Sequence, residues 1–269
     1  MEVTILGSAA AEGWPALFCA CDTCKRARAA GGKNIRSRAA VQFGPKHRFD
    51  FGPDSWYHEA VLGADLSALE YLFISHSHGD HWRPGELTYL RAPFAHDNKV
   101  PLNVYGTEAV IRKGVETLGA VETVVFHEAE PLVPIMAGEL IVTPITASHM
   151  TTELCLNYVV TVGERNVLCA WDTGWYEDDE TWRYLETLRL YCVIMECTCG
   201  PVKCERNHMD FEHHLAAKER LANAGAISSD CVFVATHFSH NVGLLHDELE
   251  HILNPHGVQV AYDGMTITI

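Results

Sequence analysis

The chain has 269 residues, of which 48% are hydrophobic and 20% are charged, and its formal net charge at pH 7 is −15. This length and composition predict one globular α/β domain over residues 1–269. The negative charge argues against a long nucleic acid as partner, because phosphate backbones are bound by clustered Lys and Arg. No run of 18 apolar residues occurs in the sequence, so we expect no membrane span and no membrane partner.

The N-terminal residues enter a predicted strand over 3–6 directly. They lack the basic start and the long apolar stretch of a signal peptide, so we expect a cytoplasmic protein. The chain contains ten cysteines. In a reducing compartment they are expected to bind metal or to pack in the core rather than to form disulfides.

The first cysteines form a compact motif, Cys19-x-Cys21-x-x-Cys24. Three thiolates at this spacing can surround one tetrahedral zinc ion and need a fourth ligand from elsewhere in the chain. A disulfide within the motif and unliganded core cysteines are the alternatives.

A histidine-rich motif follows a predicted strand over 71–75. It contains His76, His78, Asp80 and His81. In extended chain His76 and His78 point to the same side and can bind one ion. Gly79 is expected to allow a sharp turn, so that Asp80 and His81 face a second ion. Imidazole and carboxylate ligands suit zinc, manganese or iron. A histidine-rich surface loop is the alternative.

The remaining pattern alternates strands and helices, which favours α/β layering. The predicted strands are 39–43, 48–51, 102–106, 140–149, 155–162, 167–171, 192–196, 232–236, 258–262 and 265–269, the last two as a hairpin. The predicted helices are 84–90, 108–118 with Thr107 as its cap, 178–190, 211–224 and 244–253; residues 54–69 are helical or irregular. His149, Asp172 and His237 each stand where a predicted strand ends, so they are expected to gather at one edge of a sheet.

The His-x-His-x-Asp-His motif together with these strand-end residues resembles the metallo-β-lactamase-fold hydrolases. The resemblance implies an αββα sandwich with two mixed sheets flanked by helices. It also implies two divalent ions, Mn²⁺ or Zn²⁺ with iron as a further option. His76, His78 and His149 would bind one ion, Asp80, His81 and His237 the other, and Asp172 would bridge both. Such ions lower the pKa of a shared water and neutralise the charge of a bound phosphate. Asp50 falls where this family places an aspartate that supports the metal loop; a turn aspartate is the alternative.

A narrower resemblance rests on Gly13-Trp14-Pro15 before the cysteine motif, on Arg206-Asn207-His208-Met209-Asp210 and on Thr236-His237-Phe238-Ser239-His240. These segments are similar to the PhnP-like phosphodiesterases, the cyclic phosphoribosyl phosphodiesterases of the carbon–phosphorus lyase pathway. The resemblance implies a structural Zn²⁺ held by Cys19, Cys21, Cys24 and His240. It makes His208 a catalytic residue beside Asp80, near the phosphate oxygens or donating a proton to the leaving alkoxide. A surface role for His240 and a helix-capping role for His208 are the alternatives.

Some residues depart from that family. Cys197, Cys199 and Cys204 lie close to His208 in the sequence and would either bind a further metal or line a loop. Lys203 and Arg206 would either hold a second phosphate or be solvated charges.

The resemblance predicts a dinuclear metal-dependent phosphodiesterase that acts on a small cyclic or nucleotide-like phosphodiester, similar to phosphoribosyl 1,2-cyclic phosphate. A carboxyl-ester, lactone or thioester hydrolase on the same metal site is the first alternative. A non-catalytic metal-binding accessory protein is the second. The expected partner is a small phosphorylated substrate, and a homodimer is one assembly that the sequence allows.

Overall fold

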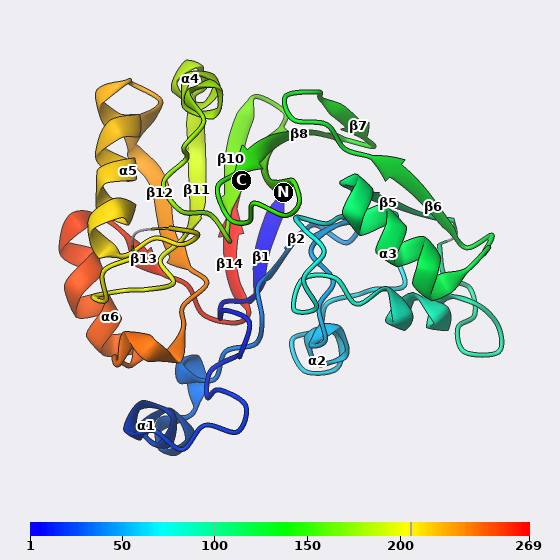
Figure 1. The fold of residues 1–269 in the computed structure, drawn as a ribbon, viewed down its shortest axis with the longest axis horizontal. Coiled ribbons are helices and arrows are strands. Elements are labelled where there is room, and N and C mark those ends of the chain that lie inside the picture. The colour runs from blue at the N-terminus through cyan, green and yellow to red at the C-terminus, as the bar shows by residue number, and fades with distance from the viewer. Residues whose placement is uncertain (100, 205) are drawn as a thin grey trace.

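The computed structural model describes residues 1–99, 101–204 and 206–269, and in this part of the chain two seven-stranded sheets pack face to face (Figure 1). The first sheet has the order β14 (Met265–Thr268), β1 (Glu2–Gly7), β2 (Ala40–Phe43), β3 (His47–Phe49), β4 (Tyr71–Phe73), β5 (Leu102–Gly106) and β6 (Val124–Glu128). The second has the order β13 (Gln259–Val260), β12 (Ile227–Thr236), β11 (Leu190–Glu196), β10 (Arg165–Ala170), β9 (Cys155–Val162), β8 (Leu140–Ala147) and β7 (Ile135–Ala137).

Both sheets are mixed in the same way. Strands β14, β1, β2 and β3 pair antiparallel, and β3 to β6 pair parallel. Strands β7 to β10 pair antiparallel, and β10 to β13 pair parallel. Parallel neighbours end at the same edge, so residues that follow them are brought together.

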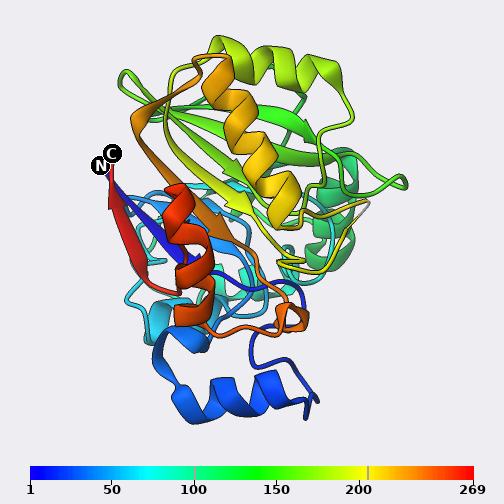
Figure 2. The ribbon, with the colours of Figure 1, turned by 90° about the vertical axis from the view of Figure 1, so that its left-hand side faces the viewer.

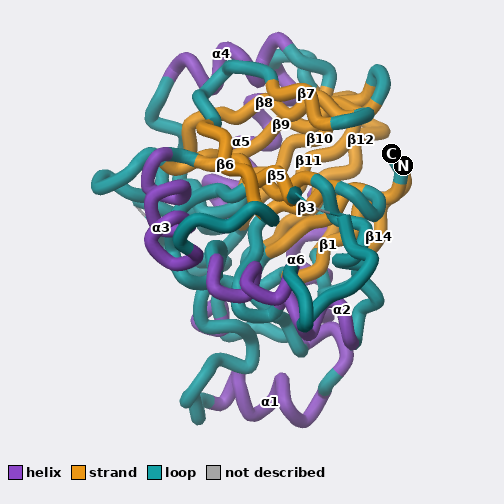
Figure 3. Tube along the Cα trace, turned by 90° about the vertical axis from the view of Figure 1, so that its right-hand side faces the viewer, coloured by secondary structure: helices purple, strands orange, loops and turns teal. Residues whose placement is uncertain are grey.

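Helices cover the outer faces of the two sheets (Figures 1 and 2). Helix α3 (Glu108–Leu118) and the 3₁₀ helix η2 (Pro84–Leu90) lie against the first sheet, with α2 (Ser55–Ala60) near its end. Helices α4 (Asp179–Thr187), α5 (Phe211–Asn223) and α6 (His246–Leu253) lie against the second. Helix α1 (Asp22–Ala30) lies apart from the sandwich, as Figure 3 also shows. The predicted αββα sandwich with two mixed sheets is confirmed.

The core between the sheets is built on stacked aromatic rings. Phe49 and Phe73 stack at 5.0 Å between ring centroids, and Tyr158 from the second sheet forms a T-shaped pair with Phe49 at 5.3 Å. The Tyr158 hydroxyl donates to the Ile74 carbonyl oxygen over 2.7 Å. Aromatic packing of this kind contributes beyond the area it buries, and here it fixes the second sheet against the strand that leads into the histidine motif.

Local patterns predicted most elements well. The predicted helix over 108–118 is α3, although the Thr107 hydroxyl makes no capping hydrogen bond. The short strands β6 and β7 and helix α1 were not predicted. Within the described ranges, no helix combines the length and hydrophobicity that a membrane crossing requires.

The predicted C-terminal hairpin is wrong. Strand β13 pairs with β12 in the second sheet, whereas β14 pairs with β1 in the first. Asp263, in the turn between them, accepts hydrogen bonds from Ser8 and Ser37. These long-range contacts hold the turn between the two sheets, so the turn signal at Asp263-Gly264 marks a crossing rather than a hairpin.

The expected role of Gly79 is also wrong, because Gly79 does not adopt a positive φ and a Cβ there would meet nothing within 4 Å. The glycine that the motif requires is Gly52. A Cβ on Gly52 would overlap the carbonyl oxygen of Asp80. The neighbouring Phe51 amide donates to the His81 carbonyl oxygen over 2.8 Å, so this segment directly supports the histidine motif.

We predict that Gly52→Ala displaces Asp80 and destabilises the fold by about 1–3 kcal/mol, the usual cost of overpacking. It should also weaken metal binding. The matched variant Gly79→Ala should leave both properties near the wild-type values. Thermal unfolding and metal content, measured on both variants, check this, and a Gly52→Ala protein with wild-type metal content would contradict it.

Candidate metal centre

The predicted catalytic ligands come together where strands of both sheets end. Their donor atoms form groups whose members all lie within 4.8 Å of one another: His76, His78 and His149; His76, His81 and Asp172; and Asp80, His81 and His237. The Asp172 carboxylate stands between them, with Oδ2 2.7 Å from His81 Nε2 and 2.9 Å from His237 Nε2. This grouping is compatible with the predicted division of ligands between two ions.

Each buried histidine is oriented by a partner on its outer nitrogen. The Nδ1 atoms of His76, His81, His149 and His237 hydrogen-bond with Ser75 Oγ (3.0 Å), Asp50 Oδ2 (2.6 Å), the Asn207 carbonyl oxygen (3.2 Å) and Thr198 Oγ1 (2.8 Å), respectively. Metal-binding histidines are typically fixed in this way, because the outer hydrogen bond sets the ring orientation and directs the other nitrogen inward.

The inward atoms face one another, and their close contacts are with other members of the same group, such as Asp172 Oδ2 with His81 Nε2 and His237 Nε2. Among the described residues, the buried side-chain atoms without a hydrogen bond include His76 Nε2, His81 Nε2, His149 Nε2, His237 Nε2 and Asp172 Oδ2. Buried polar atoms are seldom left unpaired, and a cluster of them facing one space needs an explanation. Imidazole nitrogens with carboxylate oxygens fit divalent zinc, manganese or iron.

The charge of Asp172 suits this role. Burial alone would raise the pKa of this carboxyl, but His237 and His81 outweigh burial and hold its pKa well below the ordinary value. Asp172 is therefore an anion at neutral pH and available as a ligand.

Three site residues adopt strained backbone angles where the chain leaves a strand. The φ angles of Asp50, Asp172 and His237 are 60°, 51° and 59°. Non-glycine residues rarely occupy this left-handed region, and those that do cluster at functional sites.

Asp50 supports the histidine motif. Its fully buried carboxylate accepts hydrogen bonds from the Ser75 amide (2.7 Å), Ser75 Oγ (2.8 Å), His81 Nδ1 (2.6 Å) and Trp171 Nε1 (2.6 Å). These contacts match the supporting role that the resemblance implies, rather than that of an aspartate capping its own turn.

Glu196 is a functional residue that our sequence reasoning missed. Its buried carboxylate accepts hydrogen bonds from the Thr173 amide (2.6 Å), the Met209 amide (2.9 Å) and His208 Nδ1 (3.0 Å). Burial disfavours a charge on His208, but Glu196 outweighs it and raises the pKa of His208 to about 9. Glu196 is the last residue of β11, and other site residues also lie where a strand ends. This strand-end position is the sequence feature that could have indicated Glu196.

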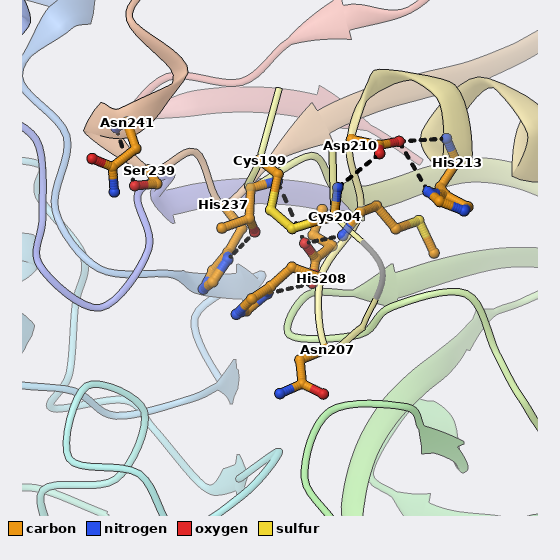
Figure 4. The surroundings of a disulfide bond; sticks show 12 residues. Cys199, Cys204, Asn207, His208, Asp210, His213, His237, Ser239 and Asn241 are labelled. Atoms are coloured by element: carbon orange, nitrogen blue, oxygen red, sulfur yellow. Dashed lines mark hydrogen bonds and ion pairs between the residues drawn. A yellow bond between two sulfur atoms is a disulfide. The ribbon is translucent and has the colours of Figure 1, made fainter. Parts of the chain in front are cut away.

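His208 lies beside the metal-ligand group. Its ring centroid is 5.0 Å from that of His149 and 5.7 Å from that of His237, and Figure 4 shows the His208 and His237 rings pointing to the same side. Both line a cavity of about 680 Å³ that also exposes His78, Asp80 and Asp172. This cavity is large enough for a ligand bigger than a phosphate group.

The additional cysteines near His208 do not form a metal site. Cys199 and Cys204 form a disulfide (Figure 4). Cys197 is buried in the core of the second sheet's side of the sandwich. The expectation that the cysteines avoid disulfides is therefore wrong for this pair, because the loop brings their Cα atoms within 6.2 Å. Lys203 and Arg206 are exposed and are not among the residues that line the cavity.

The second predicted metal site lies beside helix α1. The sulfur atoms of Cys19, Cys21 and Cys24 and a ring nitrogen of His240 all lie within 4.8 Å of one another. His240 Nδ1 is 3.7 Å from Cys19 Sγ and 3.5 Å from Cys21 Sγ. Tetrahedral zinc with Zn–S distances of about 2.3 Å places ligand atoms about 3.8 Å apart, so the four residues fit this ion.

Within the cysteine motif, the surroundings of Cys21 favour its thiolate. Cys21 Sγ accepts the Cys24 amide over 3.4 Å, and this bond together with His240 lowers the pKa of Cys21 to about 6. Cys24 Sγ accepts the Ala16 amide over 3.3 Å, although burial raises the pKa of Cys24 to about 11. A bound cation would offset that effect of burial.

Comparison with known proteins identifies the family. A family model described as a beta-lactamase superfamily domain matches residues 45–238. A diphosphatase from the PhnP family has a similar structure, with a TM-score of 0.78, 21% identity, and 100% of this chain and 97% of that chain covered. Zn²⁺-bound PqqB from Methylobacterium extorquens (TM-score 0.74, 15% identity, 100% of both chains) and human tRNase Z, short form (0.70, 19%, 100% and 99%), are also similar. At these identities the structures show a shared fold. No curated protein sequence matches the chain.

We predict that the fully loaded protein binds about three metal ions per chain, two at the Asp172 centre and one at the cysteine motif. Asp172→Ala should lose metal from the first centre and keep the zinc at the second. Cys24→Ser should do the reverse.

Elemental analysis by mass spectrometry after removal of loosely bound metal measures both contents. Asp230→Ala, which removes an exposed carboxylate on β12, is the control and should bind as the wild type does. Full metal content in Asp172→Ala would contradict the assignment.

Proposed function

The chain belongs to the beta-lactamase superfamily domain family and is a metal-dependent hydrolase, and from this premise we propose that its substrate is a small cyclic or nucleotide-like phosphodiester. A ribosyl 1,2-cyclic phosphate is the type of molecule that we favour. The observation that carries the proposal is the His208–Glu196 pair at the cavity wall.

His208 is suited to act as a general acid. Its Nδ1 is held by Glu196, so Nε2–H is the donor left for a group in the cavity. Hydrolysis of a phosphodiester releases an alkoxide, which needs a proton because it is a poor leaving group. A protonated imidazole at this place would also stabilise the negative charge that develops on the phosphate oxygens.

Two bound divalent ions would supply an activated water and would neutralise the charge of the phosphate. The chain's own residues then hold and orient the substrate. Asp80 and Asp172 are carboxylates in the cavity wall, and we propose that Asp80 has a catalytic role in fixing the reacting centre. His208 would lie on the side of the leaving group.

Three polar residues of the cavity wall could hydrogen-bond with the hydroxyl groups of a ligand. Glu12, Ser239 and Asn241 line the cavity, and Ser239 Oγ donates to Glu12 over 2.6 Å. No Lys or Arg occurs among the described residues that line this cavity. This lining supports a sugar beyond the phosphodiester, whereas a second phosphate would meet no Lys or Arg in the described lining.

We predict that the metal-loaded protein hydrolyses phosphodiesters in a panel that holds bis(p-nitrophenyl) phosphate, a 2′,3′-cyclic nucleotide, a ribosyl 1,2-cyclic phosphate, a lactone and a thioester. His208→Ala should lower kcat for the cyclic substrates by about 10²–10⁴-fold with metals retained, because their alkoxides need a general acid. The loss should be smaller for bis(p-nitrophenyl) phosphate.

Turnover of the lactone or thioester alone would replace the phosphodiesterase proposal with a carboxyl-ester, lactone or thioester hydrolase on the same metal site. Absence of any turnover by the loaded protein would favour a non-catalytic accessory role. Asp230→Ala serves as the control for surface mutation.

We also predict a specific pH dependence. The pKa of His208 is raised to about 9, so the acid is protonated at neutral pH and kcat for cyclic substrates should fall as the pH rises through about 9. Glu196→Gln removes the carboxylate that raises this pKa, so the fall should move to lower pH. A pH–rate profile of both proteins checks this, and an unshifted basic limb in Glu196→Gln would show that Glu196 does not control the acid.

A further inference from the structure

A disulfide between Cys199 and Cys204 closes the loop between β11 and α5 (Figure 4). The two residues are only 5 positions apart. A crosslink over so short a loop removes less conformational entropy from the unfolded chain than one over a long loop would, so global stability alone is a weak reason for the bond. The position of the disulfide beside the cavity, rather than its effect on unfolding, suggests a functional role.

The disulfide braces the segment that contains His208. Cys199 itself lines the cavity. Its amide donates to the Met209 carbonyl oxygen over 3.0 Å, and the Cys204 amide donates to Asp210 Oδ2 over 3.0 Å. Each half of the disulfide is thus hydrogen-bonded to one of the two residues that follow His208.

The braced segment controls two parts of the site at once. His208 is the proposed general acid, and the preceding carbonyl oxygen, that of Asn207, accepts the hydrogen bond from His149 Nδ1 over 3.2 Å. Asn207 has a φ of 66°. Its backbone nitrogen lies so close to Gly174 that a Cβ on Gly174 would be only 3.0 Å from it. A shift of this segment would therefore move the acid and turn the ring of a predicted metal ligand.

We propose that the Cys199–Cys204 disulfide is a positioning element for His208 and Asn207, and that its reduction lowers turnover at the proposed phosphodiesterase site. The proposal rests on the proposed function. Reduction by a dithiol breaks the sulfur–sulfur bond and delivers two electrons and two protons, which leaves two cysteine thiols and the oxidised cyclic form of the dithiol. In the reducing compartment that the sequence predicts, disulfides are usually transient and serve catalysis or redox sensing.

The first experiment determines the state of the bond. Metal-loaded protein is denatured with a chelator and alkylated without reductant, and intact mass is measured. Eight of the ten cysteines should react, and all ten should react after treatment with dithiothreitol. Ten reactive cysteines in protein purified under air would overturn the proposal.

The second experiment measures kcat and KM for both states with a 2′,3′-cyclic nucleotide and with bis(p-nitrophenyl) phosphate. Reduction should lower kcat for the cyclic nucleotide by about tenfold or more, because a displacement of about 1 Å at a reacting centre has effects of this size. KM should change little. The effect on bis(p-nitrophenyl) phosphate should be smaller, since p-nitrophenolate leaves without a proton. An equal loss on both substrates would show that reduction acts through general loosening or through the metal ligands, and it would overturn the positioning of His208.

Variants separate this bond from the other thiols. The double variant Cys199→Ser/Cys204→Ser should behave as the reduced protein and should not respond to dithiothreitol. Cys231→Ser, which changes a half-buried free cysteine on β12, should respond as the wild type does. Metal content is measured in each state, because reductants also reach Cys19 and Cys21. Unchanged kcat on reduction overturns only this proposal, whereas absence of phosphodiester turnover in either state overturns the proposed function and, with it, the regulation.

Discussion

The site depends on a single buried carboxylate that joins the two sheets. Asp50 follows β3 and accepts hydrogen bonds from Ser75 and His81 in the loop after β4, and also from Trp171 at the end of β10. The first two donors belong to the first sheet and the third to the second. A buried carboxylate is costly unless its oxygens are paired, and Asp50 is paired with donors from both sheets. Together with the Tyr158–Ile74 hydrogen bond, Asp50 therefore fixes the relative position of the two strand ends.

The arrangement around Asp172 follows from that fixed edge. Each buried histidine of the site has one nitrogen held by Asp50, Thr198, Ser75 or the Asn207 carbonyl oxygen, and its other nitrogen faces the space around Asp172 without a well-formed hydrogen bond. A core optimised for stability alone would pair or remove such atoms, because unpaired buried polar groups destabilise a fold. Such atoms also occur elsewhere in the described chain, for example Trp14 Nε1 and His47 Nδ1, but five of them gather around Asp172. A concentration of this kind is expected of a functional site held in place by the rest of the molecule.

How much of the site can be predicted from the sequence depends on how far apart its residues lie along the chain. His76, His78, Asp80 and His81 are close along the chain, so spacing alone indicates a metal motif. His149, Asp172 and His237 could be placed with them only by the strand-end position and the family resemblance, since no local pattern encodes contacts between distant strands. Glu196 has the same strand-end position, but the family resemblance assigned it no role, so the sequence analysis did not identify it. The predicted C-terminal hairpin is wrong because Asp263 is held by Ser8 and Ser37, which are distant in the sequence. The Cys199–Cys204 disulfide is not predicted because a reducing compartment was expected to keep all cysteines reduced, although these two are close in the sequence.

The segment Thr236–His240 explains why the cysteine motif, which lies beside a helix outside the sandwich, belongs to the same site. His237 faces Asp172, and His240 faces the sulfur atoms of the cysteine motif. Between them, the Phe238 amide donates to the Ser8 carbonyl oxygen and the Ala10 amide donates to that of Phe238.

These backbone bonds attach the loop that carries Glu12 to the same segment. Glu12 in turn accepts the Ser239 hydroxyl, lies 3.8 Å from His240 Nε2 and lines the cavity. An ion at the cysteine motif would fix His240 through Nδ1, and fixing His240 restrains both His237 and Glu12. An occupied cysteine motif would thus help to determine the shape of the cavity on the side of Glu12.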